Sequence, residues 1–432
     1  MALTLIKGAR GKTAGQGREL SVTVRKIIDD VRARGEAALF EYAGRYDGVK
    51  PETMRVGRES VQAAYDATPE ETVEALRLAH RRIRDFASRQ RDCLLELSYK
   101  DGEGRLELGH RLLPVESCGC YVPAGRYPLP SSALMSITTA KVAGVARVAA
   151  TSPPVCGTDI HPAVLVAMDI AGADEIYRAG GAGAIAAFAY GVPAGADGGI
   201  RKVDMIAGPG NRFVTEAKRQ VSGDVGIDGL AGPSEVLIIA DSSAEPRFVA
   251  ADLLAQAEHD PEARPELVCT DRGVIDRTFN EIERQLAVLP TKETAALSWE
   301  ANGVVYLAAG LDDAVKLANE RAPEHIELQI DPAAERSIAE RLTAYGSLFV
   351  GHYAPVAFGD FVSGTNHILP TAGSARFSSG LWVGTFMRAA FHQFISKEGC
   401  ETLASPCASL AGTEGLFGHR DSVMVRLEGT GA

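Results

Sequence analysis

The first part of the chain carries apolar side chains at the spacing of an amphipathic helix. One helical face, with positions i, i+3, i+4 and i+7, consists of Val24, Ile27, Ile28 and Val31. Gly35 interrupts this pattern, and helical patterns resume over residues 36–45 and again from about Pro69. The N-terminal region is therefore predicted to be helical.

From residue 120 onward, short apolar runs alternate with helical stretches. The runs span residues 145–150, 175–177, 203–206, 235–240, 267–269, 304–307 and 348–350. Several are bounded by Gly, Pro or Asp, and such runs between helices are typical of parallel sheets covered on both faces. The predicted fold class is α/β.

The end of the chain has a different pattern. An irregular stretch is expected after Pro370, and from about Thr385 the pattern is helical again, with polar interruptions. The last 50 or so residues are too few and too weakly apolar for an independent domain. We expect them to form an arm that packs on something else, a second subunit being one candidate.

Composition limits the classes of function. The 432 residues, 46% hydrophobic and 23% charged, suit a globular protein of two or three domains. A net charge of -11 opposes binding to nucleic acid or to an anionic membrane. No run reaches the roughly 18 apolar residues that span a bilayer, and the start lacks a signal-peptide pattern. Seven cysteines without paired spacing argue for reduced thiols. We expect a cytoplasmic protein without nucleic-acid or membrane partners.

A candidate metal site begins on the helical pattern that ends at His259. Gln256 and His259, at i and i+3, project from the same side of the helix. Two ligands leave a divalent ion under-coordinated, and the best further source is the glycine-rich stretch 358–367, expected to be a loop, which contains Asp360. If the terminal arm crosses to another subunit, His419 would complete four ligands. Mixed nitrogen and oxygen ligands suit zinc, and manganese or iron also fit.

Two glycine-containing turns are candidates for a dinucleotide or phosphate. Residues 181–186 fit G-x-G-x-x-A, with Gly183 as the second glycine, although chance or close helix packing explains this pattern as well. Residues 203–218 read as a strand, a Gly-Pro-Gly turn and a helix. The free amides at that helix start could bind an anion, with Asn211 as a further hydrogen-bonding group. A turn without a ligand is the alternative.

Two further motifs carry polar chemistry. Ser234, in a small-residue turn before a strand, either contacts a ligand or caps its loop. Glu324 and His325 place a carboxylate beside an imidazole at the end of the expected helix 311–320. This pair either transfers protons or is an ordinary surface pair.

Together these motifs closely resemble the histidinol dehydrogenase family, over nearly the whole chain. The most specific segments are residues 208–220, 231–237, 254–259, 323–325 and 363–371. The resemblance implies one zinc ion held by Gln256, His259, Asp360 and His419, with the last ligand coming from the partner subunit of an intertwined homodimer.

The resemblance also implies a reaction and the residues that perform it. An alcohol would be oxidised through a bound aldehyde to a carboxylate with two NAD, L-histidinol to L-histidine by default. Glu324 and His325 would be catalytic, and Tyr121, Gly183 and Asn211 would lie at the cofactor. The residues implied in substrate binding are Ser234, Gln256, His259, His325, Asp360, His367, Glu414 and His419.

The architecture implied is two unequal Rossmann-like domains with parallel sheets, one inserted in the other, plus helical terminal segments. The expected parts are an N-terminal segment 1–20, a first domain 21–119 and 236–378, an inserted domain 120–235, and a dimerisation arm 379–432.

Two positions depart from the family pattern. Gly183 stands where family members usually carry Gln, which removes one side-chain contact to the cofactor. The loop after Tyr121 contains Arg126, and it looks more like a paralogous branch that includes sulfopropanediol dehydrogenases. Arg126 would pair with a sulfonate or carboxylate, pair with a cofactor phosphate, or lie in solvent. The alternatives are therefore a paralogue that oxidises another small polar alcohol, such as a sulfonated diol, and a metal-binding homologue without turnover.

Overall fold

The computed structural model describes residues 2–9, 17–155, 157, 159–193 and 198–428. Parts of the expected terminal segments, residues 1, 10–16 and 429–432, lie outside this range. The chain divides into two compact units: residues 1–90 with 115–386, and residues 91–114 with 387–432. Within the described residues, no helix is both long and apolar enough to cross a membrane. The domain boundaries expected from the sequence stay a prediction.

The first unit contains a six-stranded sheet in the order β1-β11-β10-β9-β12-β13. Its strands are β1 (Leu3–Lys7), β9 (Glu235–Ala240), β10 (Arg264–Cys269), β11 (Val304–Ala308), β12 (His325–Gln329) and β13 (Ser347–Val350). All neighbours pair in parallel except β1, which pairs antiparallel with β11 at the edge. The central strands β9 and β12 lie side by side, with His325 opposite Val236.

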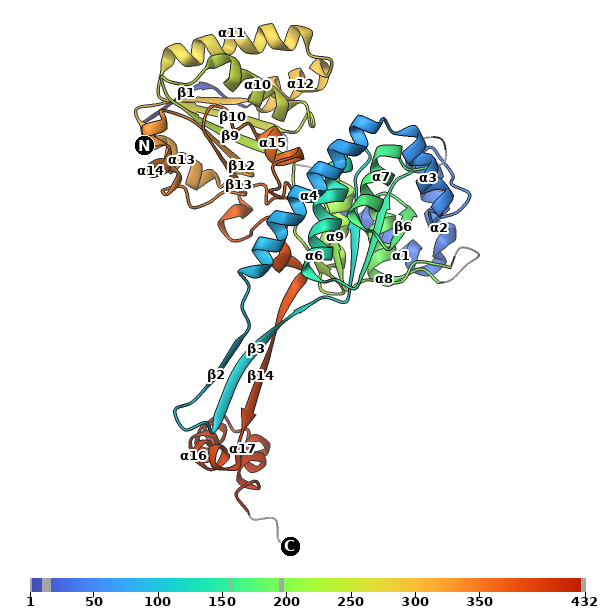
Figure 1. Cartoon of the computed structure of the whole chain (residues 1–432), viewed down its shortest axis with the longest axis vertical. Helices are drawn as coiled ribbons and strands as arrows, with labels where there is room; N and C mark the ends of the chain where they lie inside the picture. The colour runs from blue at the N-terminus through green and yellow to red at the C-terminus, as the bar shows by residue number, and fades with distance from the viewer. Residues whose placement is uncertain (1, 10–16, 156, 158, 194–197, 429–432) are drawn as a thin grey trace. The chain divides into compact units, whose positions relative to one another are not determined.

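Helices cover both faces of this sheet (Figure 1). One face carries α10 (Pro246–Ala257), α11 (Arg272–Val288) and α12 (Lys292–Asn302), and the other carries α13 (Leu311–Arg321) and α14 (Pro332–Ala339). Side chains alternate across β9: Val236 packs with α10, whereas Leu237 packs with α13. A crossover helix runs back along its strand, so the last turn of α10 returns to the amino end of β9.

The first unit also contains a five-stranded parallel sheet in the order β6-β5-β4-β7-β8. Its strands are β4 (Ser117–Tyr121), β5 (Arg147–Ser152), β6 (Glu175–Arg178), β7 (Met205–Ala207) and β8 (Gly226–Ile227). The associated helices are α5 (Pro130–Ala133), η2 (Leu134–Thr138), α6 (Thr139–Ala143), α7 (Pro162–Ala171), α8 (Gly181–Tyr190) and α9 (Arg212–Val221). The two parallel sheets confirm the predicted α/β class.

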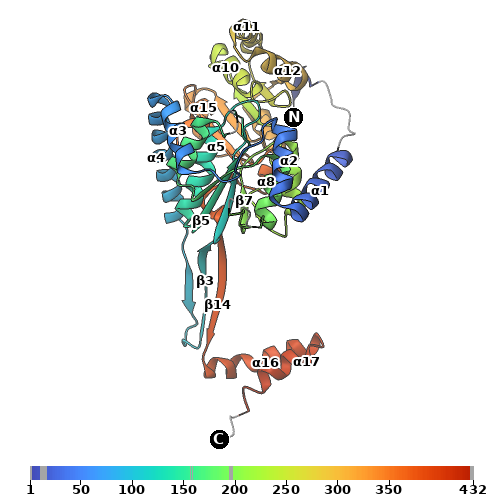
Figure 2. The ribbon, with the colours of Figure 1, turned by 90° about the vertical axis from the view of Figure 1, so that its right-hand side faces the viewer.

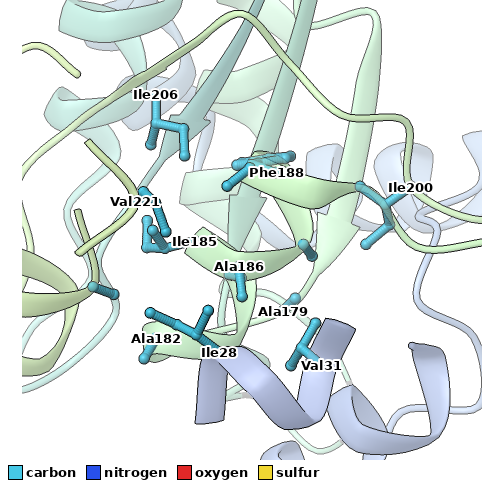
Figure 3. Close-up of a cluster of buried hydrophobic side chains, with 14 of the residues drawn as sticks. Ile28, Val31, Ala179, Ala182, Ile185, Ala186, Phe188, Ile200, Ile206 and Val221 are labelled. Atoms are coloured by element: carbon cyan, nitrogen blue, oxygen red, sulfur yellow. The ribbon is translucent and has the colours of Figure 1, made fainter. Parts of the chain in front are cut away.

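The N-terminal helices pack on this second sheet and its helices. They are α1 (Gly17–Arg34), α2 (Glu36–Tyr42), η1 (Ala43–Asp47), α3 (Arg58–Ala67) and α4 (Glu70–Asp92). Figure 3 shows Ile28 and Val31 of α1 beside Ala182 and Ala186 of α8. The apolar face expected on α1 is confirmed, because all four of its residues are buried.

The second unit consists of a three-stranded antiparallel sheet followed by two helices (Figure 2). Its elements are β2 (Leu97–Lys100), β3 (Leu106–Pro114), β14 (Met387–Ile395), α16 (Lys397–Thr413) and α17 (Phe417–Met424), with β3 in the middle of the sheet. Large apolar side chains remain on its surface: Phe391 is 84% exposed and Phe394 63%.

Two sequence predictions about local structure were wrong, and one strand of the central sheet was missed. Residues 387–395 form strand β14, paired along its length with β3, where a helical pattern was expected from Thr385. Asp360 lies on a short helix, α15 (Val356–Phe361), in a stretch expected to be a loop. The end of the expected helix 311–320 is followed at once by strand β12, which the sequence reading missed. The remaining short helices are η3 (Ser374–Arg376) and η4 (Val383–Phe386).

Replacing Ile28 by Ala should lower the free energy of unfolding by about 2–5 kcal/mol, because a fully buried side chain would leave a cavity between α1 and α8. Val22→Ala on the same helix is the control: Val22 is 52% exposed, and the change should stay within about 0.5 kcal/mol. Chemical denaturation measures both variants. Equal losses would contradict the packing described for α1.

Candidate active site

The backbone of one residue holds both members of the expected acid–base pair. The N–H of Glu235 donates to Oε2 of Glu324 at 2.8 Å. The carbonyl oxygen of Glu235 accepts from Nδ1 of His325 at 2.9 Å. Glu324 is 6% exposed and His325 4%, so the pair is not an ordinary surface pair.

The contact with Glu235 determines the tautomer of His325. A carbonyl oxygen can only accept, so the proton of the neutral ring lies on Nδ1 and the lone pair on Nε2. Nε2 is buried and has no hydrogen-bond partner, and it lies 3.8 Å from Oδ1 of Asp360. His325 therefore presents an unshared basic nitrogen.

Burial moves the two pKa values in opposite directions. Burial raises the pKa of the Glu324 carboxyl well above its ordinary value, against the lowering effect of the Glu235 N–H. Burial lowers the pKa of the His325 imidazole, and Asp360 opposes this shift only in part. His325 is consequently neutral at neutral pH, while Glu324 is a carboxyl group poised to hold or release a proton.

Three of the expected zinc ligands come from two helices beside this pair. Gln256 lies in the last turn of α10, where its amide nitrogen is buried without a hydrogen-bond partner. His259 follows two residues after the end of α10 and is exposed. Asp360 lies on α15, and the charges of both Asp360 and His259 act on His325. Asp360 and His259 therefore act on the imidazole of His325, and Gln256 lies three residues before His259 in the last turn of α10.

The other two residues expected from the arm lie in the second unit. Glu414 follows the end of α16, and His419 lies in the first turn of α17; both are exposed. No three His, Cys, Asp or Glu side chains of the described ranges lie together as a metal-binding group. Of the four expected ligands, His259 and Asp360 are the two of those residue types that lie in the first unit, so they cannot form such a group of three. An amide oxygen, an imidazole and a carboxylate form a donor set that fits zinc and leaves room for a further imidazole.

His367 joins α15 to the helices that follow β4. Its Nδ1 donates to the backbone oxygen of Asp360 at 2.9 Å, so Nε2 accepts from the hydroxyl of Ser132 at 3.2 Å. The neighbouring Asn366 donates to the backbone oxygen of Met135 at 3.1 Å. His367 is thus held in one orientation next to Asp360.

The expected cofactor residues lie at the carboxyl ends of strands in the five-stranded sheet. The hydroxyl of Tyr121 accepts from the N–H of Gly181 at 3.2 Å, and burial raises the pKa of Tyr121 to about 12. Gly181 has a positive φ of 59°, and a Cβ added there would meet nothing within 4 Å. Open space at a helix start after a strand fits a dinucleotide phosphate. Gly183 is buried, and a Cβ there would lie 3.3 Å from Leu39 of α2.

A buried ion pair supports the second turn of this region. Gly208 has a φ of 119°, and a Cβ there would lie 2.1 Å from the carbonyl oxygen of Tyr121, so only glycine fits. Lys218 donates to the oxygen of Gly208 at 3.0 Å and pairs with Asp228, whose other oxygen accepts from the N–H of Gly208 at 2.7 Å. Asn211 caps α9 by accepting from two backbone amides, which leaves its NH₂ group as the donor.

Sequence reasoning missed the residues that hold the site. Glu235 acts through its backbone, which no side-chain pattern reveals. The roles of Ser132 and Lys218 are visible only from their hydrogen-bond partners in the structure. The position of Lys218, in the helix that directly follows the Gly-Pro-Gly turn, was a usable signal. Ser234 is half-buried directly before Glu235, at the same edge as the acid–base pair.

Comparison with known proteins gives the class of this protein, an oxidoreductase that acts on a CH–OH group. The chain matches the family model described as histidinol dehydrogenase over residues 11–427. It is 42% identical to histidinol dehydrogenase of Geobacter metallireducens, covering 98% of this chain and 95% of the relative. It is 46% identical to histidinol dehydrogenase of a Synechococcus species, covering 94% and 91%.

A solved structure gives the same result. The crystal structure of histidinol dehydrogenase from Elizabethkingia anophelis is 33% identical, with a TM-score of 0.89 and coverage of 98% of this chain and 94% of the other. The chain belongs to the histidinol dehydrogenase family.

Proposed function

We propose that this chain oxidises L-histidinol through the aldehyde to L-histidine with two NAD, with one zinc ion per subunit, in the cytoplasm. The observation that carries the proposal is the buried pair Glu324 and His325, held by the two backbone groups of Glu235. A buried neutral imidazole with a free nitrogen beside a carboxyl of raised pKa suits two successive proton transfers.

His325 performs the proton transfer of each oxidation. Its Nε2 takes the hydroxyl proton of the alcohol in the first step and of the hydrated aldehyde in the second. Glu324, once ionised, takes a proton from the water that attacks the aldehyde, and its raised pKa makes it the stronger base for this step. In the complete reaction, one alcohol, one water molecule and two NAD are consumed, and one carboxylate, two NADH and three protons are produced.

The cofactors supply the remaining chemistry. NAD, when bound, would accept the hydride from the carbinol carbon, and we assign its contacts to Tyr121, Asn211 and the first turn of α8 with Gly183. Zinc, when bound, would fix and polarise the alcohol. We assign its ligands to Gln256, His259, Asp360 and His419 of the partner subunit, and further substrate contacts to Ser234, His367 and Glu414.

A homodimer with exchanged arms follows from this ligand assignment. Phe391 and Phe394 lie exposed on opposite faces of β14, and a single chain leaves this apolar surface uncovered on both faces. Exchange would cover such a surface and bring His419 to the other subunit's site.

A second candidate substrate is another small polar alcohol with an anionic group. Arg126 is exposed and donates to the hydroxyl of Thr294 at 3.2 Å, while Tyr127 donates to the backbone oxygen of Glu258 at 3.3 Å. Arg126 is thus held at α12, and Tyr127 holds the same loop at the residue after α10, the helix of Gln256. We infer that the guanidinium would bind a sulfonate there.

A substrate panel tests the proposal. L-histidinol should yield about two NADH per substrate consumed, whereas a chain that stops at the carbonyl yields about one. A sulfonated diol is the comparison, with Arg126→Ala as the variant. If the protein oxidises the diol but not histidinol, and Arg126→Ala lowers kcat/KM for the diol about tenfold or more, the second candidate replaces histidinol as the substrate. If no alcohol yields NADH, both candidate substrates are wrong.

His325→Asn should lower kcat by about 10²–10⁴-fold, because the general base is lost. The lowered pKa keeps the wild-type base neutral, so kcat/KM should hold its plateau as the pH falls through 6.5 and decline only below it. Steady-state kinetics between pH 5 and 9 measure both effects. His110→Asn, in the second unit, is the control. Unchanged turnover in His325→Asn would remove the assigned base.

Coexpression of two inactive chains tests arm exchange. Gln256→Ala and His419→Ala are each expected to be inactive, but a mixed dimer regains one intact site. Random assortment should restore about a quarter of wild-type activity. Gln256→Ala with Asp360→Ala is the matched control, because both lesions lie in the first unit and no intact site can form. Equal recovery in both mixtures, or none in either, contradicts exchange.

A further inference from the structure

Strand β12 has three polar side chains on the α10 face of the sheet, His325 and two more behind it. His325, Glu327 and Gln329 alternate on one face of β12, while Ile326 and Leu328 enter the apolar core on the other. Glu327 is 1% exposed and Gln329 3%. A carboxyl buried this deeply in a central strand costs free energy unless it is bonded on all sides.

Glu327 contacts both helices that carry expected metal ligands. Its Oε1 accepts from the N–H of Val356, the first residue of α15, at 2.8 Å. Its other oxygen accepts from Nε2 of Gln329 at 3.3 Å, and the same Nε2 donates to Oδ2 of Asp252 on α10 at 2.8 Å. The carboxyl groups of Glu327 and Asp252 also share a hydrogen bond.

The spacing makes these contacts relevant to the site. Asp252 lies one helical turn before Gln256 on the same side of α10, and Val356 lies one turn before Asp360 on α15. Each helix is thus fixed one turn away from its ligand, and the strand is fixed two residues after His325. None of these three anchors requires a bound ion.

We propose that Glu327 is a positioning residue, whose carboxyl group ties α10 and α15 to β12 and so sets the places of Gln256 and Asp360 around His325. The inference rests on the proposed function, in which Gln256 and Asp360 hold the metal. Fixing of ligands by bonded groups behind them is how metal sites gain affinity.

Glu327 acts as a neutral acid. Burial raises its pKa well above the ordinary value, and burial raises the pKa of Asp252 to about 6. At neutral pH the proton therefore lies on Glu327, which donates to Asp252. Glutamine keeps the two contacts to the helices, because its oxygen still accepts from Val356 and its NH₂ still donates to Asp252; only the longer contact from Nε2 of Gln329 is lost. Leucine can do neither.

The experiment compares Glu327→Gln and Glu327→Leu in two measurements. Amide exchange over residues 356–361 is measured on the metal-free protein, and the half-time of zinc transfer to a chelator on the holoenzyme. Glu327→Gln should stay within about twofold of wild type in both. Glu327→Leu should exchange and lose zinc about 10–100-fold faster. Glu266→Leu is the control, because Glu266 is a carboxyl of strand β10, which β9 separates from β12, and it pairs with Arg321 of α13. Both values should stay near wild type.

The outcomes separate the inference from the proposed function. Wild-type values in Glu327→Leu overturn the inference, and so does Glu327→Gln failing as badly as Glu327→Leu. If the wild-type protein binds no zinc, the zinc assignment in the proposed function is wrong, and the amide-exchange measurement alone decides the inference. If Glu327→Leu does not fold, Asp252→Ala replaces it: faster zinc loss with unchanged exchange at Val356 supports the tie to α10, and unchanged zinc loss overturns it.

Discussion

The site depends on two hydrogen bonds from one residue of a central strand. The N–H and carbonyl of Glu235 hold a carboxyl and an imidazole that are neighbours in the chain. The carbonyl oxygen accepts a hydrogen bond from Nδ1–H, so the lone pair of the neutral ring lies on Nε2. Because both side chains are buried, their pKa values shift in opposite directions. Backbone geometry in a parallel sheet, which does not vary with side-chain identity, thus sets the chemistry.

The candidate site groups of the two sheets in the first unit lie at opposite ends of their strands. The acid–base pair lies at the amino end of β12, where α10 and α15 return with Gln256 and Asp360. The candidate cofactor groups lie at the carboxyl ends of β4 and β7, the usual position for a dinucleotide in an open parallel sheet. Contacts such as that of Ser132 with His367 join the segments after β4 to the stretch that follows α15. The groups that we assign to substrate and to cofactor therefore come from different supersecondary units, which share few local sequence signals.

Much of the fold was predictable because apolar runs report buried parallel strands directly. The run 235–240 matches β9 residue for residue, and the i, i+3 spacing of Gln256 and His259 predicts a ligand pair at the end of α10. Strand β12 was missed because His, Glu and Gln alternate with its apolar residues, a pattern that reads as an exposed edge although every residue is buried. Strand β14 was missed because an exposed strand carries no core pattern. The polar residues that disguised β12 are the ones that build the site.

The strand order also has a consequence for synthesis on the ribosome. β9 ends at Ala240, but the neighbour that completes its free edge begins only at His325. At 5–20 residues per second, translating residues 241–324 takes of the order of ten seconds. During that interval the edge of β9 that later pairs with β12 has no partner. Five of the six residues of β9 are apolar, so this edge can pair wrongly. The nascent chain gains the imidazole of His325 and the cover for that edge in the same event.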